Sequence, residues 1–287
     1  MVRLLHLELL RERYVPSRNR RLNYVLGSQK CVINMPTSIP DAPPGTRIAY
    51  SRGEFQFGEL RVPSGSGPHP VAIVIHGGYW RARYDLAEVG HLCEAVTRQG
   101  LATWSLEYRR IGNPGGGWPG TLDDVRTGAA HLEKIAAERS LDLKHVVAMG
   151  HSAGGHLVLW LAKQNAIALR GLVALAPVAD LRLAWELKLS NTVVADLLGG
   201  SPQDLPDRYR SASPIELVPL GVAQRVLHGA NDDIVPLEIS RRYVAAAKKS
   251  GDDSKLIEVA GAGHFELIDP RSSAWRVVKD AVLELVK

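Results

Sequence analysis

Strand-like and helix-like segments alternate along this chain from Gly45 onward, and this alternation limits the possible folds more than any other feature of the sequence. Short runs rich in β-branched residues predict buried strands, and stretches with helical spacing follow most of them. Strands alternating with helices indicate a mostly parallel sheet with helices on both faces. In such a sheet ligands bind at the carboxyl ends of the strands, so we expect the chemistry in the loops that follow strands.

The predicted elements can be given by residue range. Residues 48–62 are expected to form an antiparallel hairpin, and a helix is expected to begin where Thr121 caps it. Residues 180–213 break the alternation and predict a small cap inserted at the strand ends. The other expected strands are 71–75, 101–106, 145–149, 172–175, 224–227 and 255–259, and the other expected helices are 84–99, 153–166, 237–249 and 272–286.

The net charge of +5 is concentrated at the N-terminus. Residues 1–40 contain seven basic and two acidic groups, and the remaining 247 residues contain 28 of each sign. Because the body of the chain is formally neutral, we exclude a nucleic-acid partner. We predict two parts: a basic arm over 1–44, and a catalytic domain over 45–287. Residues 1–34 are expected to be an upstream extension, or an arm docked on that domain or on a neighbouring subunit, which leaves a homodimer open.

Hydropathy and cysteine content indicate where in the cell the protein acts and whether it binds a metal. No apolar run approaches the roughly 20 residues that a membrane span needs, and Arg3, His6 and Glu8 interrupt the leucines at the start as they would not in a signal peptide. Cys31 and Cys93 are too few for a disulfide framework or a zinc site. The histidines match no zinc spacing. We therefore expect a cytoplasmic protein with no membrane partner, no metal and no cofactor.

The segment Gly150-His151-Ser152-Ala153-Gly154 fits the pattern G-x-S-x-G. An apolar strand leads into it and a helix follows, which is the context in which this pattern places a serine on a sharp strand-to-helix turn. The two glycines avoid collisions with neighbouring backbone. A helix-capping serine would not explain both glycines, so we predict that Ser152 is a nucleophile.

A serine hydroxyl needs a base and an orienting acid. His264 follows the last predicted strand within Gly261-Ala262-Gly263-His264-Phe265, where the glycines permit a turn toward Ser152. Asp232 follows the strand 224–227, and its neighbour Asp233 is the alternative acid. The chain order of serine, acid and histidine is the order found in α/β-hydrolases. We predict the triad Ser152, Asp232 and His264.

An oxyanion formed on the attacked carbonyl needs hydrogen-bond donors. The N–H of Ala153 at a helix start is one candidate. The loop that follows strand 71–75, His76-Gly77-Gly78-Tyr79-Trp80, offers the N–H groups of Gly78 and Tyr79, while His76 is expected to be structural. Side chains that line a substrate pocket are predicted more loosely, and core packing is an equal alternative for the tryptophans. These pocket candidates are Trp80, Trp118, His151 and Trp185.

Taken together, these motifs resemble the α/β-hydrolase superfamily, and within it the carboxylesterase and kynurenine formamidase-like branches. The motifs are HGGYW at 76–80, EYR at 107–109, GHSAGGHL at 150–157, HGANDDIVP at 228–236 and GHFELIDP at 263–270. The resemblance implies an α/β-hydrolase fold and a serine hydrolase acting on a small-molecule carboxylic ester. An arylformamidase is the main alternative. A peptidase of the prolyl-oligopeptidase type and a catalytically silent binding protein are less favoured, because there is no room for a gating domain and no triad member is missing.

Overall fold

The computed structural model describes residues 23–26, 29–32 and 42–287. The chain divides into two units, residues 1–40 and 41–287. In the first unit, β1 (Asn23–Leu26) pairs antiparallel with β2 (Gln29–Val32). The predicted docking of the N-terminal arm rests mainly on residues outside those that the structure describes.

Within residues 42–287, eight strands form one sheet in the order β10-β9-β8-β7-β5-β6-β4-β3. The hairpin partner β3 pairs antiparallel with β4, and β4 pairs antiparallel with β6, while all the other pairs are parallel. This confirms the predicted hairpin and the mostly parallel sheet. The strands are β3 (Thr46–Ala49), β4 (Phe57–Arg61), β5 (His69–Ile75), β6 (Ala102–Leu106), β7 (Leu141–His151), β8 (Gly171–Leu175), β9 (Ala223–Gly229) and β10 (Ser254–Val259).

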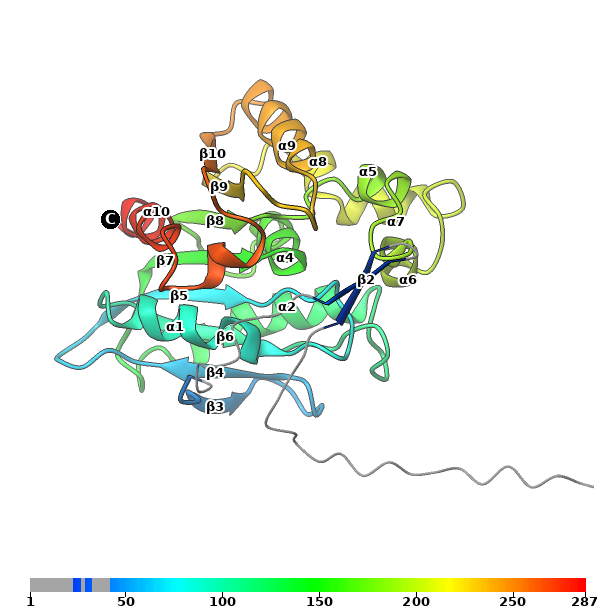
Figure 1. Ribbon diagram of the computed structural model, residues 1–287. Coiled ribbons are helices and arrows are strands. Elements are labelled where there is room, and N and C mark those ends of the chain that lie inside the picture. Colours follow the sequence, from blue (N-terminus) through cyan, green and yellow to red (C-terminus); the bar gives the residue numbers. More distant parts are fainter. Residues whose placement is uncertain (1–22, 27–28, 33–41) are drawn as a thin grey trace, which may run out of the picture. The chain divides into compact units, whose positions relative to one another are not determined.

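Helices cover both faces of this sheet (Figure 1). On one face, α1 (Gly90–Thr97) and α10 (Trp275–Val286) share a core with alternate residues of the central strands, such as Ala72 and Val74 of β5. The opposite face carries α2 (Gly120–Ala130), α4 (Ala153–Leu161) and α9 (Leu237–Lys249). Burial on both faces explains why the central strands are continuous apolar runs rather than alternating ones. The short elements between them are η1 (Leu86–Val89), α3 (Leu132–Ile135), η2 (Ala162–Gln164) and η3 (Phe265–Ile268).

Four short helices follow β8 and interrupt the alternation of strands and helices. They are α5 (Leu181–Glu186), α6 (Val193–Leu198), α7 (Pro206–Ala212) and α8 (Pro214–Leu217). The Asp180 side chain caps α5 by accepting the N–H of Leu183 at 3.0 Å. Figure 1 shows α5, α6 and α7 beyond the carboxyl ends of the parallel strands, where the sequence predicts a small cap.

Two local predictions differ from the structure. The helix expected to be capped by Thr121 begins two residues earlier, with Pro119 at the cap position. The Thr121 hydroxyl instead accepts the N–H of Gly117 and donates to the carbonyl of Arg109, because a threonine inside the first turn can close the preceding loop. The helix expected over 153–166 is α-helical only as far as Leu161 and then tightens into η2.

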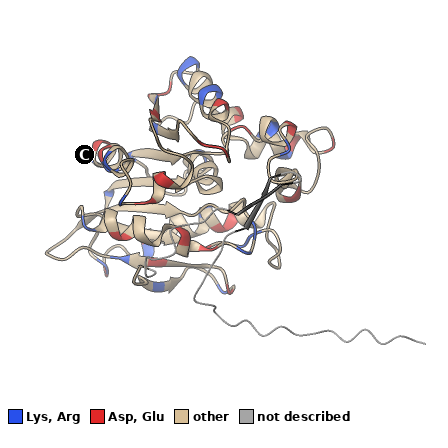
Figure 2. Ribbon diagram, viewed as in Figure 1, with Lys and Arg blue, Asp and Glu red and all other residues tan. Residues whose placement is uncertain are grey.

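Charged groups of both signs are interspersed over residues 42–287 (Figure 2). In the part of the chain that the structure describes, none of the helices combines the length and the apolar character that a membrane crossing requires.

Candidate active site

Ser152 lies on a sharp turn between β7 and α4. Its backbone has φ of 55° and ψ of −115°, a region that non-glycine residues rarely adopt. Such a conformation costs about 1–3 kcal/mol and persists where the surroundings hold it. Here the backbone N–H of Ser152 donates to the Leu175 carbonyl at 2.8 Å, and the Ser152 carbonyl accepts the N–H of His156 at 3.1 Å. The fold therefore holds the serine in a strained position.

Two glycines make this turn possible. A Cβ atom on Gly150 would lie 2.3 Å from the carbonyl oxygen of Gly154, and one on Gly154 would lie 2.0 Å from the carbonyl oxygen of Ile75. Each contact is with backbone, which cannot move aside without moving the turn. The sequence pattern around Ser152 thus reflects a steric requirement of the structure.

Asp232 and His264 are brought together by the loops that follow β9 and β10. His264 Nδ1 lies 2.7 Å from Asp232 Oδ2. The other carboxylate oxygen of Asp232 accepts the backbone N–H groups of Ile234 and Val235, each at 2.9 Å. Asp233, the alternative acid, is exposed. Because a carboxylate only accepts, His264 donates from Nδ1, which leaves the lone pair of its Nε2 available.

The pKa values of this pair are shifted by its surroundings. Burial opposes ionisation of Asp232, but hydrogen bonds from His228 and His264, the charge of His264 and the Val235 N–H outweigh it. These contacts hold the pKa of the Asp232 carboxyl well below its usual range. For His264, burial and then the neighbouring His151 lower the pKa, and Asp232 opposes them. A histidine with a lowered pKa is neutral at neutral pH, as a general base must be.

Ser152 is joined to this pair through its neighbour in sequence. The Ser152 hydroxyl makes no hydrogen bond to His264 or to any other residue that the structure describes. However, the ring of His151 lies 4.4 Å from the ring of His264, centroid to centroid, and His151 Nε2 is 3.1 Å from the His264 carbonyl oxygen. Hydrogen bonds between catalytic groups are often long before substrate binds. The three predicted triad residues thus lie at one edge of the sheet, with one of their two mutual hydrogen bonds formed.

The loop after β5 turns through a left-handed backbone conformation. Gly78 and Tyr79 have φ of 93° and 53°, and Arg81 N–H closes the turn on the Gly78 carbonyl at 3.0 Å. Within residues 42–287 the N–H groups of Gly78, Tyr79 and Ala153 donate to no protein acceptor. The Tyr79 hydroxyl contacts the Ile234 carbonyl at 3.4 Å, so this loop also touches the loop of Asp232.

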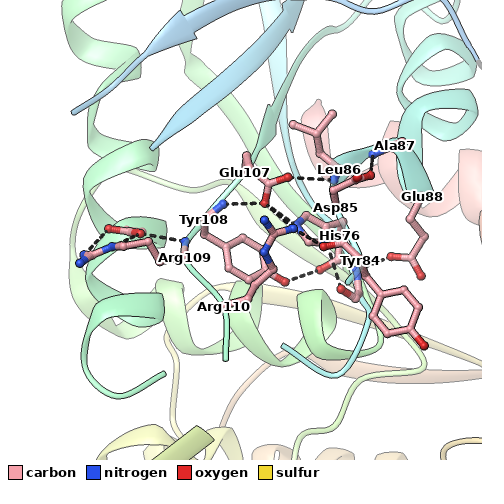
Figure 3. Close-up of polar contacts among 12 residues, drawn as sticks. His76, Tyr84, Asp85, Leu86, Ala87, Glu88, Glu107, Tyr108, Arg109 and Arg110 are labelled. Carbon is pink, nitrogen blue, oxygen red and sulfur yellow. Dashed lines mark hydrogen bonds and ion pairs between the residues drawn. The ribbon is translucent and has the colours of Figure 1, made fainter. Parts of the chain in front are cut away.

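A cluster of buried polar groups contacts this loop (Figure 3). His76 places Nδ1 2.9 Å from the Gly77 carbonyl and Nε2 3.1 Å from Glu107, and its ring stacks on Tyr108 at 4.4 Å. Glu107 also forms a buried ion pair with Arg110 at 3.0 Å. Both nitrogens of His76 are therefore committed to protein acceptors, in accordance with the structural role expected for it.

The residues predicted to line a pocket lie in different environments. Trp80 and His151 are fully buried, and for Trp80 this fits the alternative of core packing. Trp80 packs edge-on against His156 at 5.2 Å, and the contacts of His151 are with Glu88 and His264. Trp185 on α5 is partly exposed, as is Trp118. The sequence could not separate these cases, because a tryptophan in a loop packs inward or outward according to tertiary contacts alone.

Two buried polar residues escaped the sequence analysis. His228 lies 3.3 Å from Asp232 Oδ2 and places its other nitrogen 2.7 Å from the Ser240 hydroxyl, so it supports the predicted acid from behind. The only sequence indication was its place in the motif of Asp232. Glu88 in η1 accepts the Gly77 N–H, and no motif pointed to it. Among the residues that the structure describes, no three histidine, cysteine or acidic side chains group as metal ligands would.

A family model described as BD-FAE matches residues 60–246, which include the loop after β5, Ser152 and Asp232. The chain belongs to the BD-FAE family. The sequence-based prediction of an α/β-hydrolase of the esterase and formamidase branches is thereby confirmed.

Among curated relatives of this BD-FAE family member, an uncharacterized protein of Mycobacterium tuberculosis is 28% identical over 91% of this chain and 88% of its own length. The kynurenine formamidase of Danio rerio is 23% identical over 77% of this chain and 75% of its own length. Other relatives are named as esterases or carboxylic ester hydrolases. A truncated carbohydrate esterase from gut microbiota has the same fold, with a TM-score of 0.73 and 21% identity over 85% of this chain and 96% of its own. Several of these relatives and the structural neighbour are thus named as esterases.

Proposed function

We propose that this chain is a serine carboxylesterase that cleaves small carboxylic esters through an acyl-enzyme. One observation supports this most strongly: the strained Ser152, with an unbonded hydroxyl, lies at the same edge of the sheet as a buried His264–Asp232 pair. A purely structural serine would not require the conformational cost of this turn.

In the proposed reaction, His264 Nε2 takes the hydroxyl proton while Ser152 Oγ attacks the ester carbonyl. The tetrahedral oxyanion collapses, the bond to the alcohol oxygen breaks, and His264 returns its proton to the departing alcohol. Water then attacks the acyl-enzyme, with His264 again accepting and returning a proton. Asp232 holds His264 in the tautomer with a free Nε2 and stabilises its charged form.

The oxyanion is proposed to accept hydrogen bonds from the N–H groups of Gly78, Tyr79 and Ala153. Their lack of protein acceptors supports this role, because an unpaired donor in a buried site is available to a developing charge. Ala153 adds the favourable field at the N-terminus of α4. Loss of one such donor typically costs about 3–4 kcal/mol of transition-state stabilisation.

The test is turnover of p-nitrophenyl acetate by the wild type and by Ser152→Ala. In a triad enzyme, removal of the nucleophile lowers kcat by a factor on the order of 10⁶. The variant should keep its fold, since alanine fits where serine does, and circular dichroism checks this. Near-normal turnover by a folded Ser152→Ala would refute the assignment.

An arylformamidase is the second candidate. The relatives named kynurenine formamidase support it. A panel of p-nitrophenyl esters of graded chain length alongside N-formylkynurenine separates the two, and formamide turnover above every ester would favour this candidate.

A further inference from the structure

Glu88 contacts both His151, which precedes the proposed nucleophile, and residues 76–80, the loop after β5 that is called the oxyanion loop from here on. Its Oε2 accepts the backbone N–H of Gly77, and its Oε1 lies 3.4 Å from His151 Nδ1. Figure 3 shows the Glu88 side chain extending from its helix toward the loop of His76. One carboxylate therefore joins two segments, after β5 and at the end of β7, that supply different parts of the proposed site.

Gly77 is shaped for this contact. A Cβ atom at this position would lie 3.0 Å from Glu88 Oε2, 3.2 Å from Glu88 Oε1 and 3.0 Å from the His151 carbonyl oxygen. Its φ is not in the left-handed region, unlike that of Gly78. The absence of a side chain at Gly77 is therefore explained by the close approach of the His151 carbonyl oxygen and of the carboxylate, not by a turn that requires glycine.

His151 extends the connection to the loop of the general base. Its Nε2 lies 3.1 Å from the carbonyl oxygen of His264, and its ring contacts the ring of that residue. Glu88 and His151 together thus connect the loop of Gly78, the turn of Ser152 and the loop of His264. Three loops at the carboxyl ends of β5, β7 and β10 meet at this single pair.

The environment strengthens the contact between Glu88 and Gly77. The side chain of His151 is fully buried, and that of Glu88 is 13% exposed. The hydrogen bond from the Gly77 N–H to an ionised carboxylate in such a setting is stronger than one on the surface. His151 Nδ1 makes no hydrogen bond with any described residue and contacts Glu88 at 3.4 Å. Burial opposes ionisation of Glu88, but His151, His76 and the Gly77 N–H outweigh it and lower the pKa of the carboxyl.

We propose that Glu88, acting together with His151, is a positioning residue that holds the oxyanion loop at the correct distance from Ser152. The proposal rests on the esterase function proposed above. Glu88 touches no reacting atom in this scheme. It orients Gly77, and through Gly77 the N–H groups of Gly78 and Tyr79. Because the oxyanion exists only in the transition state, losing this support should lower kcat and leave KM nearly unchanged.

The experiment compares Glu88→Ala, Glu88→Gln and a matched control, Glu94→Ala, in p-nitrophenyl acetate hydrolysis. Glu94 is an acid on the neighbouring helix α1 that pairs with Arg98 at the surface. We expect Glu88→Ala to lower kcat about 10- to 100-fold, since a displacement of about 1 Å costs up to 10²-fold, with KM changed less than about twofold. Glu88→Gln should recover most of the activity, because its amide oxygen still accepts the Gly77 N–H. Glu94→Ala should match the wild type.

A second measurement distinguishes a loss of positioning of the oxyanion loop from disorder of the whole active site. A trifluoromethyl ketone forms a tetrahedral adduct with an oxyanion, so its affinity for Glu88→Ala should fall by the same factor as kcat/KM. The affinity for a simple alcohol product, which has no oxyanion, should not change. An alcohol affinity that falls in parallel would indicate a disordered site and overturn the proposal.

The outcomes are distinguishable from failure of the esterase assignment. A wild type that turns over no ester, or a Ser152→Ala variant that does, refutes the proposed function. An active wild type with an inactive Ser152→Ala and a fully active Glu88→Ala overturns only the role of Glu88. If Glu88→Ala does not fold, Glu88→Asp replaces it. Its shorter side chain keeps the charge but cannot reach both partners, so an unchanged kcat in that variant would also overturn the proposal.

Discussion

Two buried histidine–carboxylate pairs lie at the same edge of the sheet and differ in what they leave unbonded. In the loops after β9 and β10, His264 directs Nδ1 to Asp232, and its Nε2 has no hydrogen-bond partner among the described residues. In the segments after β5 and β6, His76 gives one nitrogen to Glu107 and the other to the Gly77 carbonyl. The first pair can exchange a proton with a ligand, whereas the second is saturated.

The carboxylates differ in the same way. Among the residues that the structure describes, Asp232 receives only neutral backbone donors and two histidines, and no arginine or lysine pairs with it. Glu107 is paired with the buried guanidinium of Arg110 and accepts the N–H groups of Leu86 and Tyr108. An acid paired with a permanent cation stabilises structure. An acid whose main charged partner is a histidine responds to the protonation of that histidine. The difference predicts chemistry at one pair and stability at the other.

The largest effect is expected where the carboxylate of the first pair is neutralised. Asp232→Asn should lower kcat about 10⁴-fold, because an amide N–H facing Nδ1 stabilises the tautomer of His264 whose Nε2 carries the proton and cannot act as base. Stopped-time assays with p-nitrophenyl acetate measure this. Asp233→Asn, an exposed neighbour, serves as the control and should retain activity. The reverse pattern would exchange the roles of the two acids.

A smaller effect, of a different kind, is expected at the second pair. Glu107→Gln leaves the buried Arg110 without its counter-charge, which typically costs about 3–5 kcal/mol of the free energy of unfolding. Denaturant titration measures this, with the surface variant Glu94→Gln as a control expected to change stability by less than about 1 kcal/mol. The kcat of the folded fraction should stay within a few fold of the wild type. Unchanged stability with a lost kcat would place Glu107 in the chemistry and remove the distinction between the pairs.

The sequence predicts the fold well, and it selects the triad candidates, for identifiable physical reasons. The β-branched run that forms β5 can hardly be anything but a buried strand, and the glycines around Ser152 are required by backbone contacts of 2.0–2.3 Å. The preference for Asp232 over Asp233 rested on motif register, and the hydrogen bond to His264 agrees with it.

The supporting residues could not be predicted in the same way. Glu88 has no local pattern, because its partners Gly77 and His151 come from two other segments and meet it only through the packing of η1. The burial of Trp80 depends likewise on tertiary contacts. Periodicity and short motifs report on neighbours along the chain, so contacts that join three loops leave no trace in them.

The smallest of these effects concerns a histidine with no carboxylate at all. His156 is fully buried in α4, and its Nε2 donates to the Ala212 carbonyl at 3.0 Å. Burial lowers its pKa from 6.5 to about 4, and the Ala212 carbonyl opposes this only weakly. His156 therefore takes up a proton below about pH 6.5 in the unfolded chain, but only below about pH 4 in the folded chain. Stability is full above this range and declines as the pH falls through it, by about 3 kcal/mol in total.

His156→Gln tests this contribution against that of His264, which lowers stability in acid in the same direction. The glutamine amide can still donate to the Ala212 carbonyl but does not titrate. Urea unfolding at pH 7 and pH 4 should show the wild type losing about 3 kcal/mol more than the variant between the two values. Parallel losses would mean that His156 takes up its proton in the folded state. Burial without a carboxylate would then not suffice to keep a histidine neutral in this fold, and the lowered pKa of His264 would need a cause other than its burial.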